Sequence, residues 1–184
     1  LIIEKLDLSS FKSIREFVQR VRDRGQKIDI LINNAGVMFC PYMQTADGFE
    51  MQVGTNHLGH FLLTELLLPE VNAGGKGTRI ILLSSVANLH AKDSLLPLNV
   101  DEAHYNSLQC YFRSKLANAM YANYLSKKLL PTGIQTASVH PGGVMTEISR
   151  HNLLLRVKDG LYFVFLIYIG LIYMRIYITH GLKC

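Results

Sequence analysis

Cysteine is scarce in this chain, and tryptophan is absent. The 184 residues include three cysteines, Cys40, Cys110 and Cys184, which lie far apart and form no Cys-x-x-Cys pair. An odd number of widely spaced cysteines argues against a disulfide framework and against a zinc site. We therefore expect a protein of a reducing, intracellular compartment.

Concentrated charge is also missing. The formal net charge is +5, and the basic residues are scattered along the chain. There is no basic stripe with interleaved aromatic residues, so nucleic-acid binding is not expected. The chain has no initiator methionine and no signal peptide, and it opens on the apolar run Leu1-Ile2-Ile3. From this opening we expect that an upstream part is missing.

The sequence does contain a regular alternation of strand-like and helical segments. We predict strands at residues 1–6, 28–32, 79–83 and 134–139, and helices at 11–25, 49–68 and 110–130. Residues 88–109 are predicted to be a long loop. This order is typical of an α/β fold with a doubly wound parallel sheet, in which ligands bind at the carboxyl ends of the strands.

One predicted helix carries two residues that could take part in proton transfer. Tyr111 and Lys115 are four residues apart, so they lie on the same face of the predicted helix. A lysine ammonium close to a phenol favours the phenolate, and we expect it to lower the pKa of Tyr111. A phenol tuned in this way can exchange a proton with a carbonyl or alcohol oxygen. The pair alone also fits a half-buried tyrosine beside a solvated lysine.

Together with four other motifs, this pair resembles a known family. Residues 1–150 resemble a short-chain dehydrogenase/reductase, and within that family they are most like the retinol dehydrogenase group. The motifs are Asn33-Asn34-Ala35-Gly36, Asn56-His57-Leu58-Gly59-His60-Phe61, Ser84-Ser85, Tyr111-x-x-x-Lys115 and Pro141-Gly142-x-Val144-x-Thr146.

The resemblance implies catalytic roles for four residues. Tyr111 is expected to be the general acid/base, and Lys115 to lower its pKa and hold the nicotinamide ribose. Ser85 is expected to polarise the substrate oxygen by a hydrogen bond. Asn56 is expected to bend its helix and position a water that relays the proton to Lys115.

The resemblance also implies a nicotinamide cofactor, NADP or else NAD, because no side chain can supply a hydride. It is expected to contact two groups of residues besides Tyr111 and Lys115. The first group is Asp7, Leu8, Asn34, Ala35 and Gly36, and the second is Pro141, Gly142, Val144 and Thr146. Asp7 is expected to bind the adenine ring, and the second group to frame the nicotinamide.

Each motif also has a simpler interpretation. Residues 33–36 fit a turn after a strand, and Ser84-Ser85 fits a helix cap. His57 and His60 are interpreted as packing or surface histidines, because they lack a carboxylate partner at metal spacing. His140 lies near the expected cleft and receives no role.

The chain departs from the family pattern at both ends. The Gly-rich turn that opens the family fold is absent, so the expected Rossmann-like sheet is incomplete and lacks the first two family strands. Residues 1–6 then either pair directly with the strand at 28–32 or form an unpaired edge. Residues 151–184 form a divergent hydrophobic tail, in which 161–178 is a candidate membrane segment, a buried helix or a non-family tail.

The function expected from this resemblance is an oxidoreductase that interconverts a carbonyl and an alcohol. Its substrate would be a small, apolar, retinoid- or lipid-like molecule, and the chain would be a fragment or an isoform. The alternative is a catalytically inactive, membrane-associated interaction protein. The expected location is the endoplasmic reticulum or mitochondrial membrane, otherwise the cytoplasm. A homodimer through the helices at 49–68 and 110–130 is expected by analogy.

Overall fold

Three short strands form one parallel sheet. In the computed structural model, which describes residues 1–91 and 97–142, the strands are β1 (Ile30–Asn33), β2 (Arg79–Leu83) and β3 (Gln135–Val139), in the order β1-β2-β3. Asn33 pairs with Leu82, and Leu83 pairs with Val139. The carboxyl ends of all three strands therefore meet at one edge of the sheet. The predicted α/β class with a parallel, incomplete sheet is confirmed.

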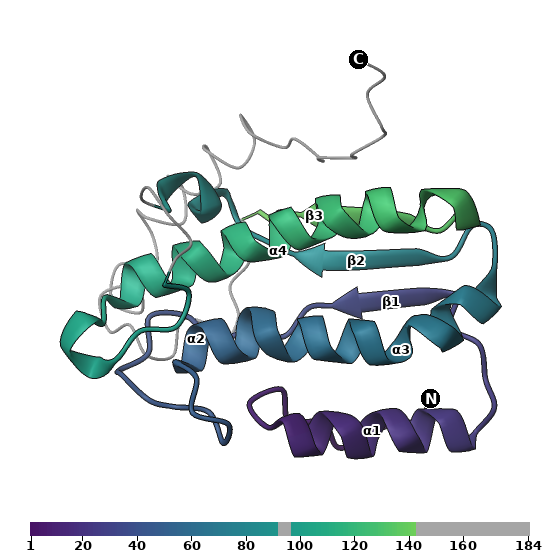
Figure 1. Ribbon diagram of the computed structural model, residues 1–184, viewed down its shortest axis with the longest axis horizontal. Coiled ribbons are helices and arrows are strands. Elements are labelled where there is room, and N and C mark those ends of the chain that lie inside the picture. The colour runs from purple at the N-terminus through teal and green to yellow at the C-terminus, as the bar shows by residue number, and fades with distance from the viewer. Residues whose placement is uncertain (92–96, 143–184) are drawn as a thin grey trace.

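Helices α3 and α4 cover one face of this sheet, and other helices pack beside them. The helices of the described residues are α1 (Phe11–Asp23), α2 (Met51–Val53), α3 (His60–Gly74) and α4 (Ser107–Leu129). Figure 1 shows α3 and α4 lying over the strands, with α1 alongside α3. A π-helix (Gly54–Gly59) joins α2 to α3. Three short 3₁₀ turns occupy Val86–His90, Glu102–His104 and Leu130–Thr132.

Two apolar clusters stabilise this arrangement. One lies between the sheet and the helices α3 and α4, and its largest fully buried members are Ile80, Leu82 and Leu125. The other lies between α1 and α3, around Ile14, Val18, Leu63 and Leu67. Ile28 and Leu31 pack against both clusters. The sheet and its helices therefore form one continuous packed unit.

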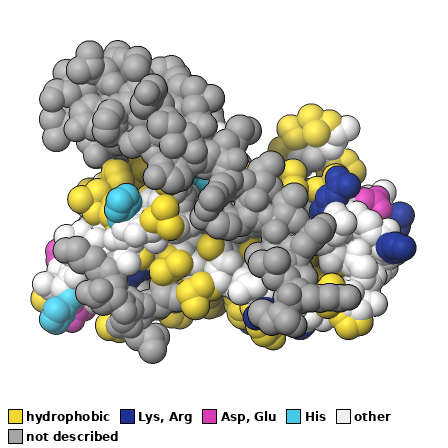
Figure 2. Space-filling model, turned by 90° about the horizontal axis from the view of Figure 1, so that it is seen from above, with side chains coloured by type: hydrophobic (Ala, Val, Ile, Leu, Met, Phe, Trp, Pro, Cys, Tyr) yellow, Lys and Arg dark blue, Asp and Glu magenta, His cyan; other side chains and the backbone are white. Residues whose placement is uncertain are grey.

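On the face shown in Figure 2, basic side chains gather away from the carboxyl edge of the sheet. Figure 2 shows that Lys and Arg, in dark blue, gather mainly at the end of the visible face opposite to the direction of the strand arrows in Figure 1. The helix α4 ends on that side with Lys127 and Lys128 in its last turn. Lys115 thus stands apart from this basic end of the molecule.

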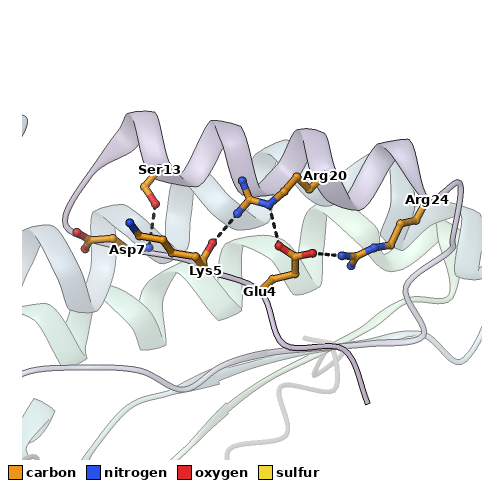
Figure 3. Close-up of polar contacts among 6 residues, drawn as sticks. All are labelled: Glu4, Lys5, Asp7, Ser13, Arg20 and Arg24. Atoms are coloured by element: carbon orange, nitrogen blue, oxygen red, sulfur yellow. Dashed lines mark hydrogen bonds and ion pairs between the residues drawn. The ribbon is translucent and has the colours of Figure 1, made fainter.

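The prediction of a strand at residues 1–6 is wrong. This segment pairs with no strand, and it lies along α1 instead (Figure 3). Arg20 donates to the carboxylate of Glu4 at 2.8 Å and to the carbonyl of Lys5 at 2.6 Å, and Arg24 also pairs with Glu4. A strand forms only where a neighbour offers ladder hydrogen bonds, and among the described residues this segment has its contacts with the arginines of α1 instead.

Some helices and strands begin or end at other residues than predicted, because tertiary contacts determine these ends. Ile28 donates its N–H to the carbonyl of Glu70 on α3, so β1 starts two residues later than predicted. Asn106 caps α4 by accepting from the N–H of Gln109 at 3.0 Å, so this helix starts before Cys110. The helix predicted to end at residue 68 continues to Gly74 because Val71 is buried in the core.

Some predictions fall outside the described residues. These are the roles of Val144 and Thr146 and the candidate membrane segment at 161–178. Within residues 1–91 and 97–142, no helix combines the length and the apolar character needed to cross a membrane.

Candidate active site

Tyr111 and Lys115 are both buried at the carboxyl edge of the sheet. They follow one another by one turn on α4, and their exposed fractions are 6% and 3%. The ammonium of Lys115 donates to the carbonyl of Leu83, the last residue of β2, at 3.1 Å. The helix thus delivers both side chains to the point where β2 ends.

Ser85 meets Tyr111 at this point. Its side chain lies close enough to the phenol of Tyr111 to act on the pKa of that group. The same hydroxyl accepts from the N–H of Ala87 at 3.2 Å and so caps the 3₁₀ turn that follows. Ser85 therefore acts as a helix cap and also lies in position beside the phenol, because a hydroxyl can both donate and accept.

The pKa of Tyr111 is shifted in the direction opposite to the prediction. Burial raises it above its ordinary value, and the hydrogen bond from Ser85 only partly opposes this effect. The Lys115 ammonium lies 5.6 Å from the centroid of the tyrosine ring, and its hydrogen bond goes to Leu83. Desolvation of the phenol therefore outweighs the lysine charge, and the phenol is protonated at neutral pH.

Burial also acts on Lys115 itself. It lowers the pKa of the ammonium to about 8, because the charged form loses its hydration. The hydroxyl of Ser84 donates at 2.7 Å to the backbone carbonyl of Lys115 and fixes this turn of α4 against β2. A lysine of this kind is close to titration at physiological pH.

Asn56 lies in the π-helix, as expected for a residue at a helix irregularity. Its side chain exchanges two hydrogen bonds with the backbone of Val37, at 2.8 Å and 2.9 Å. Its Nδ2 also donates to the hydroxyl of Ser114 on α4 at 3.1 Å. Asn56 therefore ties the loop after β1 to the helix that carries Tyr111.

The backbone carbonyl of Asn56 is already occupied. It accepts from Nδ2 of Asn118 at 3.0 Å and contacts Nδ1 of His60, also at 3.0 Å. A carbonyl oxygen has two lone pairs. A relay water on the Asn56 carbonyl would have to replace the side chain of Asn118 or of His60. The water relay stays a prediction.

The two histidines of this region are packing residues, as interpreted from the sequence. Nδ1 of His57 contacts Oδ1 of Asn118 at 3.0 Å. Burial lowers the pKa of His60 to about 4, so its ring is neutral. Within residues 1–91 and 97–142 no cluster of His, Cys, Asp or Glu has the composition of a metal site.

The turn after β1 packs closely against Lys115. Asn33 is buried and donates to the hydroxyl of Thr64 at 2.8 Å, whereas Asn34 and Ala35 are exposed. A Cβ added to Gly36 would lie 3.0 Å from Oδ1 of Asn56 and 3.6 Å from Nζ of Lys115. The missing side chain of Gly36 thus leaves space against both groups.

Other predicted cofactor residues lie further from this cluster. Oδ1 of Asp7 accepts from the N–H and the hydroxyl of Ser9, and these bonds lower the pKa of Asp7. Leu8 is buried in the cluster between α1 and α3. No described contact joins either residue to Tyr111. Pro141 and Gly142 come one residue after the end of β3, on the edge where the N–H of Ser84 donates to the carbonyl of Val139 at 2.8 Å.

Three residues at the site were missed from the sequence. Ser114 and Asn118 lie on the buried face of α4 with Tyr111 and Lys115. Their spacing was the available signal, because polar residues three, four and seven positions apart on one helix share a face. Phe39, whose ring meets Tyr111 edge-on at 5.3 Å between centroids, had no such signal.

The comparison with known sequences agrees with this geometry. Residues 1–153 match the family described as short chain dehydrogenase. Human retinol dehydrogenase 13 is 48% identical over 146 residues, which cover 79% of this chain and 44% of that protein. Mouse retinol dehydrogenase 12 is 47% identical and covers 84% and 48% respectively. The chain therefore spans about half the length of the curated relatives it matches.

Solved structures show the same fold. An uncharacterized protein from Mycobacterium paratuberculosis is 38% identical, with a TM-score of 0.68 over 80% of this chain and 53% of that one. The Pseudomonas aeruginosa RhlG/NADP active-site complex is 26% identical, with a TM-score of 0.61 over 79% and 54%. By sequence match, fold and motif order, the chain belongs to the short-chain dehydrogenase family.

Proposed function

We propose that this chain carries the catalytic centre of an oxidoreductase that interconverts a carbonyl and an alcohol with NADP(H). The observation that supports this proposal most is the buried meeting of Tyr111, Ser85 and Lys115 at the carboxyl edge of a parallel sheet. The names of the relatives, retinol dehydrogenases, support an apolar, retinoid- or lipid-like substrate. The RhlG complex supports NADP as the first choice, with NAD as the second.

The residues present fit a dinucleotide. Gly36 leaves a gap beside Nζ of Lys115 that a side chain would fill. The ammonium has three donors, and its described hydrogen bond to Leu83 uses one of them. Lys115 would hold ribose hydroxyls with the others, and the turn at residues 34–36 would lie against the cofactor. When bound, the nicotinamide supplies the hydride.

The protonation states favour proton donation by Tyr111. Its raised pKa keeps the phenol protonated at neutral pH, so in carbonyl reduction it can transfer its proton to the substrate oxygen. The hydroxyl of Ser85 lies close to this phenol and can donate to the same substrate oxygen. The positive charge of Lys115 stabilises the phenolate that forms when Tyr111 gives up its proton.

The cellular location and the oligomeric state of the protein are also proposed. Cys40 and Cys110 are buried and neither is in a disulfide, which supports an intracellular, reducing compartment. A membrane location, at the endoplasmic reticulum or mitochondria, rests on the apolar sequence at 161–178. A homodimer through α3 and α4 is supported by the exposed side chains of Phe61, Met120 and Tyr124 on these helices.

A second function has one specific observation in its favour. Ile30 and Ile32 of β1 are 54% and 57% exposed, as on a sheet that another protein surface could cover. A catalytically inactive interaction protein would keep this surface and would have no need to bind a cofactor. Cofactor binding therefore distinguishes the two functions.

The decisive experiment is a titration of the chain with NADPH and with NADH, followed by nicotinamide fluorescence. The absence of tryptophan removes energy transfer from indole to the cofactor. We expect saturable enhancement at micromolar NADPH. Lys115→Ala should weaken it at least about tenfold, because a charged ribose contact is lost. Tyr111→Phe should retain the affinity and lose turnover, because only the proton donor is removed.

Two results would contradict the proposal. The first is a folded wild-type chain that binds neither nucleotide, which would favour the interaction protein. The second is full turnover in Tyr111→Phe, which would exclude the phenol as the proton donor. Tyr124→Phe on the same helix is the matched control, because this tyrosine is exposed and lies outside the cluster.

A further inference from the structure

Gln52 is a fully buried polar residue of α2 for which the proposed mechanism has no role. Its Oε1 accepts from the N–H of Phe39 at 2.8 Å. Its Nε2 donates to the hydroxyl of Tyr105 and to the carbonyl of Ser107, each at 2.9 Å. Ser107 is the first residue of α4. One amide therefore joins the loop after β1 to the start of the helix that carries Tyr111.

The partners of Gln52 determine which way its amide points. A backbone N–H can only donate, and a backbone carbonyl can only accept. If the amide were turned over, its NH₂ would face the N–H of Phe39, and its oxygen would face the carbonyl of Ser107. Both backbone groups would then lose their partner inside the protein, which is unfavourable. Gln52 thus holds the two backbone segments in one specific arrangement.

The segment that Gln52 holds is under backbone strain. Phe39 has a φ of 53°, in the left-handed region that residues other than glycine rarely adopt. Strain of this kind persists only where the surroundings impose it. The ring of Phe39 meets the ring of Tyr111 edge-on, with 5.3 Å between centroids. The bond from Gln52 therefore keeps an unfavourable backbone conformation that places an aromatic ring on Tyr111.

This ring is part of what keeps water from Tyr111. The tyrosine is only 6% exposed, and burial is the main cause of its raised pKa. The charged group described beside it is the Lys115 ammonium, 5.6 Å from the ring centroid, whereas the buried carboxyl of Glu50 acts on Tyr105 and Cys110. If Phe39 left its place, water would reach the phenol and favour its ionised form.

We propose that Gln52 is a positioning residue, which holds Phe39 against Tyr111 and so keeps the proton donor dry and in one place. This inference rests on the proposed function, because it concerns the residue proposed there to give the proton. Gln52 acts on Tyr111 through Phe39, and its loss should be felt at the tyrosine without any change in Ser85 or Lys115.

The test measures how fast each tyrosine of the full chain is nitrated by tetranitromethane in mildly alkaline buffer without cofactor. Mass spectrometry of tryptic peptides and their fragments gives the rate for each ring. The reagent attacks the phenolate, so the rate depends on the ionised fraction and on access to the ring. Gln52→Met keeps an unbranched side chain of similar length and removes the amide. Nitration of Tyr111 should rise at least about tenfold, as for a pKa that falls by one unit.

Two tyrosines of the same helix serve as internal controls. Tyr121 is 5% exposed and packs in the cluster under α4, so its nitration rises only if the whole fold loosens. Tyr124 is 55% exposed and calibrates the reagent. The matched variant is Gln44→Met, which makes the same substitution at an exposed glutamine whose Nε2 donates to the hydroxyl of Tyr42 at 2.9 Å. Gln44→Met should leave Tyr111 as slow as in the wild type.

A double-mutant cycle tests whether Gln52 acts through Phe39. Phe39→Gly removes the ring and relieves the positive φ, so it should fold at least as well as the wild type. Its Tyr111 should nevertheless be nitrated as fast as in Gln52→Met. Adding Gln52→Met to Phe39→Gly should then change the rate by less than about twofold, because the connection is already broken.

Three results would overturn the inference. They are an unchanged rate at Tyr111 in Phe39→Gly or in a folded Gln52→Met, an equal rise at Tyr111 and Tyr121, and full multiplication of the two single effects in the double variant. The measurement needs no cofactor. The expected pattern in a chain that binds neither NADPH nor NADH would support the positioning by Gln52 and still contradict the proposed function.

Discussion

Lys115 is the residue where burial and charge conflict most directly. Its exposed fraction is 3%, and burial lowers its pKa to about 8 from the ordinary 10.5. Because the folded state binds this proton more weakly than the unfolded chain, the stability of the fold increases as the pH rises from about 8 to about 10.5. Below pH 8 the buried charge costs the fold on the order of 3 kcal/mol.

Replacing this charge should therefore stabilise the chain. We predict that Lys115→Met raises the free energy of unfolding by about 1–3 kcal/mol at pH 7, and that the gain disappears above about pH 10.5. Urea denaturation at a series of pH values measures this. Lys12→Met is the control, because the side chain of Lys12 is 87% exposed. A gain at pH 7 that persists unchanged at high pH would contradict the assigned cause.

At the scale of elements, the π-helix at Gly54–Gly59 sets the distance between α3 and the start of α1. A Cβ added to Gly59 would lie 2.4 Å from the backbone carbonyl of Leu8, closer than real Cβ contacts. Because the obstructing atom belongs to the backbone, it cannot move aside by a simple rotamer change. The glycine thus permits the close approach of two chain segments.

We predict that Gly59→Ala destabilises the fold by about 1–3 kcal/mol, since the chain at Leu8 has to move away from α3. The midpoint of urea denaturation should fall accordingly. Asn72→Ala places an alanine at an exposed position of α3, where its Cβ meets no obstructing backbone, and should leave the midpoint nearly unchanged. Equal midpoints for the two variants would show that Leu8 adapts without cost.

The elements also show which features a sequence can reveal. The strand at Arg79–Leu83 and the placement of Tyr111 with Lys115 depend on local patterns, and both were predicted. The strand expected at residues 1–6 failed because a strand needs a partner, which local sequence does not specify. The contacts of Phe39 with Gln52 and Tyr111 join separate parts of the chain, and no pattern of apolar and polar residues in the sequence predicts them.

At the scale of the whole molecule, β1 is an edge of the described sheet. It pairs with β2 on one side, and no other described strand pairs with it. Its exposed Ile30 and Ile32 lie on the face that α3 and α4 leave uncovered. An apolar edge strand of this kind is a template for pairing with another chain.

We predict that copies of the chain also associate through this edge, in addition to the homodimer proposed through α3 and α4, and that Ile30→Lys with Ile32→Lys suppresses this second association. Lysines on an edge strand repel a second copy and keep the strand hydrated. Light scattering and gel filtration over a concentration series would show a shift toward smaller assemblies. The matched control is Leu89→Lys with Leu130→Lys, which adds the same charge at two exposed positions outside the sheet. If both double variants reduce association equally, net charge and not the β1 edge controls it.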